Sequence, residues 1–152
     1  MFTSIVVGTD GSPTAAEAVR KARDLARTCG ARLHVVSAYK SAGALAALSA
    51  EAIAAGATPA DAVRLSEEIG EMTRAMLDQL AKEVSESGVE VHTHAVPGEP
   101  AHVILDLADA EAADLIVVGN RGMGSARRFV LGSVPNKISH HAPCSVLVVG
   151  TS

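Results

Sequence analysis

Short apolar runs alternate with segments of helical periodicity along almost the whole chain of 152 residues. Three of the runs are continuously apolar, which is typical of strands that are buried on both faces of a parallel sheet. A further run alternates apolar with polar residues, as a strand at a sheet edge does when one of its faces meets solvent. The five predicted strands cover residues 5–7, 33–38, 89–96, 115–118 and 146–149.

The segments between the strands carry local signals for helices. Three of them begin with a capping residue followed by proline, which fits a first turn because its missing N–H has no partner there. The order β-α-β-α-β-α-β-α-β needs right-handed crossovers between parallel strands, and therefore predicts an α/β fold, a single domain with one doubly wound sheet and helices on both faces. The capping pairs are Ser12-Pro13, Thr58-Pro59 and Glu99-Pro100, and a fourth helix is expected over residues 134–141.

The alanine-rich segment 41–57 has two interpretations, a helical flap over the binding site or an irregular connection.

Composition argues against several functional classes. The net charge is −4, and the chain has two Phe, one Tyr and no Trp, so we expect no nucleic-acid partner. No apolar run is long enough to cross a membrane and the N-terminal residues do not resemble a signal peptide, so a cytoplasmic protein without a membrane partner is expected. Cys29 and Cys144 lie far apart in the sequence and are interpreted as small apolar side chains.

Histidines occur in two pairs. His92 and His94 are at strand spacing and can share one face, but the sequence offers them no third histidine, cysteine or aspartate in register. We therefore interpret them as ordinary strand residues rather than as a metal site. His140 and His141 end the last predicted helix, where positive charge suits the negative end of the helix dipole.

Glycines gather after the predicted fourth strand. Gly119 ends that strand, Gly122 follows it, and Gly132-Ser133 precede the last helix. Glycine lets backbone approach a ligand closely, and a helix N-terminus presents N–H groups and a positive dipole end. Ligands of doubly wound sheets bind beyond the carboxyl ends of the strands, where the strand order reverses. The pattern therefore predicts a phosphate site there, beside Asp10 at the end of the first strand.

The spacing Gly119-x2-Gly122-x9-Gly132-Ser133 resembles the G-x2-G-x9-G-(S/T) pattern of ATP-binding universal stress proteins. The resemblance covers the whole chain and includes the stretches at 5–12, 98–100, 112–119 and 142–149. It implies the strand order 3-2-1-4-5 and a regulatory protein that binds ATP, together with Mg²⁺, and changes state with occupancy. It implies slow hydrolysis at most, and we expect no catalytic residue.

The resemblance also implies roles for individual residues. Asp10 would face the ribose or a Mg²⁺-bound water, Gly8 and Thr9 would line the base side, and Val35 would offer backbone groups to the adenine edge. Without the resemblance, Asp10 has the alternative interpretation of a turn residue beside Gly11. Ser133 has that of a plain N-cap, a role that is compatible with phosphate binding. The phosphate side of the nucleotide site would comprise Val118, Gly119, Gly122, Gly132, Ser133 and Val134.

Two departures from the ATP-binding pattern affect the choice of ligand. The P-loop Gly-Lys-(Ser/Thr) is absent, so efficient phosphoryl transfer is not expected. Gly8 stands where many relatives have a larger residue, and Asn120 stands where many have a Ser or Thr. Together with residues 133–136, these two residues are similar to those of actinobacterial members of the family, some of which bind cyclic AMP. Cyclic AMP is therefore the alternative ligand. Arg127 and Arg128 either neutralise a polyphosphate or remain solvated.

The last predicted strand, from Val146 to Val149, is apolar and lies at a sheet edge in the family's strand order. An uncovered apolar edge invites aggregation, so we expect a homodimer through this strand. The sequence identifies no downstream protein partner. Two other functions remain open. One is a weak ATPase that uses the same pocket, and the other is an interaction protein that binds no nucleotide. The intact glycine pattern disfavours the interaction protein.

Overall fold

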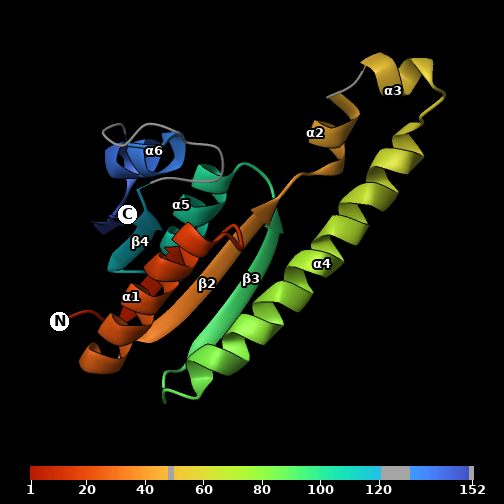
Figure 1. Cartoon of the computed structure of the whole chain (residues 1–152). Helices are drawn as coiled ribbons and strands as arrows, with labels where there is room; N and C mark the ends of the chain where they lie inside the picture. The colour runs from red at the N-terminus through yellow and green to blue at the C-terminus, as the bar shows by residue number, and fades with distance from the viewer. Residues whose placement is uncertain (48–49, 121–130, 151–152) are drawn as a thin grey trace.

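The computed structural model describes residues 1–47, 50–120 and 131–150. Its centre is a five-stranded sheet in the order β3-β2-β1-β4-β5, with every neighbouring pair parallel (Figure 1). The predicted fold class and strand order are therefore confirmed. The strands are β1 (Ser4–Gly8), β2 (Arg32–Tyr39), β3 (Val91–Pro97), β4 (Leu115–Gly119) and β5 (Ser145–Val149).

Helices cover both faces of the sheet. One face packs against α1 (Pro13–Cys29) and α4 (Pro59–Ser85), and the other against α5 (Pro100–Ala110) and α6 (Ser133–His141). Side chains of β1 alternate between the two cores: Ile5 and Val7 enter the first and Val6 the second, and all three are 0 % exposed. This double burial is the reason that the strand is continuously apolar.

The helix boundaries follow from the capping residues. The Ser12 hydroxyl accepts from the N–H of Ala15 at the start of α1, and Gly30 ends that helix with φ 68°, a left-handed conformation that glycine adopts without strain. Thr58 and Asp61 form a reciprocal capping box at the start of α4. The local signals in the sequence thus determine where these helices begin and end.

The alanine-rich segment 41–57 contains two short helices, α2 (Ala42–Ala47) and α3 (Ala50–Ala54). They lie at the N-terminal end of α4, which extends beyond the body of the protein (Figure 1). A cavity of about 460 Å³ separates them from α4, and its lining is largely apolar. Thr58 and Asp61 also line it, but they hydrogen-bond to each other.

Within the described ranges, no helix is both long enough and apolar enough to cross a membrane.

Candidate functional site

A cavity of about 140 Å³ lies at the carboxyl ends of β1 and β4. In the sheet, β2 lies on one side of β1 and β4 lies on the other. The chain builds the sheet outward from β1 in one direction with β2 and β3, and then in the opposite direction with β4 and β5, so the strand order reverses between β1 and β4. Crevices at such reversals are the usual ligand sites of open α/β sheets. The cavity is lined by Gly8, Thr9, Asp10, Ala15, Ala38, Pro100, Val118, Gly119, Val134 and Pro135.

Hydrogen bonds hold the turn after β1 in one conformation. The Thr9 N–H donates to the Val36 carbonyl at 2.9 Å, which keeps the chain attached to β2 one residue beyond β1. The Thr9 hydroxyl accepts from the Gly11 N–H at 3.2 Å, and Oδ1 of Asp10 accepts from the Ser12 N–H at 2.9 Å. These bonds place the exposed Asp10 carboxylate at the cavity, so its turn role and its predicted ligand role are compatible.

Gly8 lies between the cavity and α5. A Cβ on residue 8 would lie 2.6 Å from Cδ1 of Ile104, closer than real Cβ contacts allow. Glycine at this position therefore brings α5 close to the end of β1, in addition to leaving the cavity wall bare.

The glycine-rich excursion between β4 and α6 is anchored at both of its ends. The Asn120 N–H donates to the Val149 carbonyl at 2.9 Å, and the Asn120 carbonyl accepts from the Gly132 N–H at 3.0 Å. The Gly132 N–H is thus already used within the protein. Gly122, Arg127 and Arg128, which were predicted to hold phosphate, lie outside the described residues.

The N-terminus of α6 presents backbone donors beside the cavity. Gly132 is the N-cap and Ser133 is the first helical residue, so the interpretation of Ser133 as a plain N-cap is wrong. The N–H groups of Ser133 and Val134 have no acceptor within the helix, and Pro135 has no N–H. Two backbone donors and the positive end of the helix dipole therefore remain for an anion.

Helices α5 and α6 are joined next to this terminus by an ion pair. Nζ of Lys137 lies 3.4 Å from Oε2 of Glu99, whose carboxylate also accepts from the N–H groups of Ala101 and His102. Partial burial raises the pKa of Glu99, but these donors outweigh it and the pKa falls below its usual value. The side chain of Lys137 is 40 % exposed, and Glu99 is its partner.

Three described residues of the predicted site, Val35, Gly132 and Ser133, are not among the residues that line the cavity. Val35 is 0 % exposed in the middle of β2, and the described lining of the cavity does not include it. Ala38, nearer to the carboxyl end of β2, lines the cavity, and we therefore add it to the proposed site. Sequence analysis also missed Ala15, Pro100 and Pro135, which are apolar and are identified only by their positions at the starts of helices.

A model described as the universal stress protein family matches residues 1–150. The chain belongs to this family. Over 152 residues it is 34 % identical to the universal stress protein MJ0531 of Methanocaldococcus jannaschii, an alignment that covers 98 % of this chain and 82 % of the relative.

Solved universal stress proteins share the fold. The universal stress protein UspA from Lactobacillus plantarum has 27 % sequence identity and a TM-score of 0.80, with 97 % of each chain covered. A universal stress protein solved in complex with cyclic AMP has 28 % identity and a TM-score of 0.69, with 99 % of this chain and 98 % of that chain covered. The family assignment made from the glycine pattern is thus confirmed.

Proposed function

We propose that this universal stress protein binds an adenine nucleotide in the cavity between β1, β4 and α6, with ATP as the main ligand and occupancy as the regulatory signal in the cytoplasm. One observation carries the proposal: the cavity is lined by a carboxylate at the end of β1 and lies beside the two backbone donors at the start of α6, on opposite sides of the strand-order reversal. The carboxylate suits a ribose or a metal ion, and the donors suit phosphate.

Mg²⁺ fits this arrangement. It is usually bound by one or two carboxylates together with substrate phosphates, and Asp10 is the carboxylate that lines the cavity. Mg²⁺ would offset the charge of the triphosphate, and Asp10 would hold it while the α6 N-terminus contacts the phosphates.

Cyclic AMP is the second candidate ligand, and a specific observation favours it. A relative with 28 % identity, which covers 99 % of this chain, was solved with cyclic AMP bound. Cyclic AMP carries a single negative charge, so two backbone donors and a helix dipole could satisfy its phosphate without a metal ion.

Titration calorimetry of the nucleotide-free protein tests the proposal. We expect ATP to bind more tightly with Mg²⁺ than without it, and Asp10→Asn to reduce that difference. Asp106→Asn, which alters an exposed carboxylate of α5 outside the cavity, is the matched control. Tight binding of cyclic AMP with negligible ATP affinity would identify the second candidate as the ligand, and no binding of either nucleotide would refute the proposed function.

We also propose that two copies pair through β5. This strand is an edge of the sheet, and Leu147 is 36 % exposed on it although it is apolar. An antiparallel partner strand would satisfy the open backbone groups of the edge and cover this side chain.

A further inference from the structure

Three histidines from two neighbouring strands lie on one face of the sheet. The register pairs His34 of β2 with His92 of β3, and Val36 with His94, so the three imidazoles point toward the layer that contains α5. In the sequence alone, His92 and His94 have no third ligand in register. The pairing of β2 with β3 supplies that third histidine.

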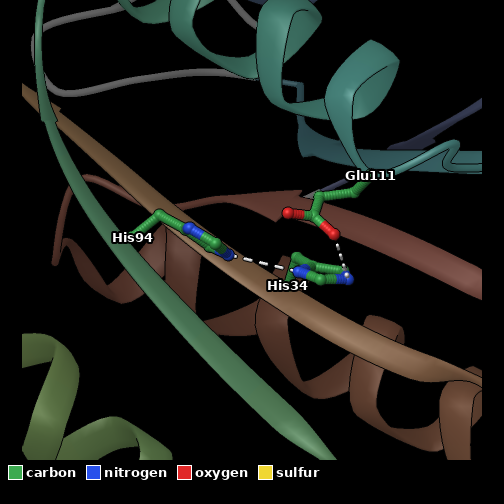
Figure 2. Close-up of side chains that lie close together, drawn as sticks. All are labelled: His34, His94 and Glu111. Carbon is green, nitrogen blue, oxygen red and sulfur yellow. Dashed lines mark hydrogen bonds and ion pairs between the residues drawn. The ribbon is translucent and has the colours of Figure 1, made fainter.

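His34 is the buried centre of this group. Its Nδ1 lies 3.2 Å from Nε2 of His94, and its Nε2 lies 3.8 Å from Oε2 of Glu111, the residue that follows α5 (Figure 2). His34 is 3 % exposed, and among the described residues its buried Nε2 has no hydrogen-bond partner. A buried nitrogen in this state is uncommon in folded proteins and calls for an explanation.

We propose that His34, His94 and Glu111 form a binding site for a divalent transition-metal ion, distinct from the nucleotide cavity. One donor atom from each of the three residues lies within 4.8 Å of the other two. The described lining of the nucleotide cavity contains none of them. The inference therefore does not depend on the proposed nucleotide function.

The donor set suits a borderline metal such as Zn²⁺. Two imidazoles and a carboxylate with an open fourth position are a common catalytic zinc set, and bond lengths near 2.0–2.1 Å place neighbouring donors about 3.4 Å apart in a tetrahedron. Nε2 of His34, the nitrogen that would bind the ion, lies 3.8 Å from Oε2 of Glu111, which is close to that spacing. The 3.2 Å contact with His94 is made by the other ring nitrogen, Nδ1, so His94 would reorient to bind the same ion. Glu111 has a side chain that is 34 % exposed, so it can move by the remaining distance, and water can reach the fourth position.

The protonation state of the histidines is also suitable. Burial lowers the pKa of His34 despite the opposing effect of Glu111, and burial likewise lowers the pKa of His94. Both imidazoles are therefore neutral at physiological pH, as metal ligands must be. The Glu111 carboxylate would balance half of the charge of a divalent ion.

His92 has a different role. Its ring stacks on that of His34 with centroids 5.2 Å apart and an angle of 20° between the planes, and its Nε2 lies 2.8 Å from a carboxylate oxygen of Glu90. It therefore holds the His34 ring in place, and we do not include it among the ligands.

The test uses the full chain, purified without a histidine tag and treated with a chelator. Titration calorimetry with Zn²⁺ should show one ion bound per chain, and Co²⁺ should give the visible absorption of a four-coordinate site. Since even residues that only support a ligand cost about 10–100-fold in affinity when removed, His94→Ala and Glu111→Gln should each weaken Zn²⁺ binding at least tenfold. Both side chains are partly exposed, so these variants should fold even if a substitution at buried His34 does not.

Two control variants remove other side chains that could bind Zn²⁺. His102 faces Glu99 at 3.3 Å in the first turn of α5, and Cys144 is a partly buried thiol. His102→Ala and Cys144→Ser should bind Zn²⁺ as the wild type does. The proposal is overturned if the wild type binds no Zn²⁺, or if folded His94→Ala and Glu111→Gln variants bind it with unchanged affinity.

Discussion

Ile104 of α5 packs directly against the backbone of Gly8 in β1, so closely that a Cβ on residue 8 would lie 2.6 Å from Cδ1 of Ile104. Gly8 also lines the proposed nucleotide cavity. We therefore expect a larger residue at this position to disturb helix packing as well as the proposed ligand site.

A double-mutant cycle isolates the effect of Gly8 on helix packing. Gly8→Ala should destabilise the ligand-free protein by about 1–3 kcal/mol, because the added methyl group overpacks the core. Ile104→Val removes Cδ1 and should cost about 0.5–1.5 kcal/mol on its own. Urea denaturation of the double variant should show a loss smaller than the sum of the single losses, since the clash is gone. Strict additivity would mean that Gly8 is not constrained by α5.

Asp114 connects the starts of β4 and β1, and it makes stability depend on pH. Partial burial opposes its ionisation, but its carboxylate accepts from the Thr3 N–H and hydroxyl and from the Ser4 N–H, and these bonds lower the pKa of Asp114. Because the pKa is lower in the folded state, ionised Asp114 stabilises the fold fully at pH values above the unfolded-state pKa of about 3.9. This stabilisation is lost as the pH falls through the folded-state pKa.

Asp114→Ala should therefore lower the free energy of unfolding at pH 7 by about 1–3 kcal/mol, since it leaves the Ser4 N–H buried without its acceptor. The difference from wild type should narrow as the pH falls toward about 3. Denaturant unfolding across this range provides the measurement. Asp106→Ala, at an exposed position of α5, should show neither effect. A difference that stays constant with pH would contradict the role of the Asp114 charge.

Leu147 tests the proposed pairing through β5. Leu147→Lys would place two ammonium groups near the two-fold axis of the pair, and like charges at close range oppose association. Analytical ultracentrifugation at micromolar concentration should show a dimer for wild type and for Leu147→Met, which keeps the apolar volume, and a monomer for Leu147→Lys. A monomeric wild type would refute the pairing.

Patterns of residues that are adjacent in the sequence predicted more of this structure than did residues that only folding brings together. Ser12, Thr58 and Glu99 were identified as helix starts because a cap and its proline are adjacent in the chain. The depth of a residue along its strand has no such signal, so the sequence did not predict Ala38 as a lining residue.

The histidine cluster depended on long-range pairing as well. His34 and His94 are 60 residues apart, and only the register between β2 and β3 brings them together. Glu111 joins them because α5 ends above the same face of the sheet (Figure 2). A single sequence fixes neither the register nor the end of the helix closely enough to reveal a contact of this kind.

Ser133 distinguishes the two candidate nucleotides. It is the first residue of α6, and Val134 next to it lines the cavity. A charge-assisted hydrogen bond contributes about 1.5–3 kcal/mol, so Ser133→Ala should weaken ATP binding roughly tenfold or more, and cyclic AMP binding much less because its single phosphate can be held by the backbone donors. Ser139→Ala is the matched control on the same helix, where the hydroxyl donates to the Asn136 carbonyl at 2.8 Å. Calorimetric titration of both nucleotides against both variants gives the comparison. If Ser133→Ala leaves ATP affinity unchanged, or if Ser139→Ala lowers it equally, Ser133 does not contact the phosphates.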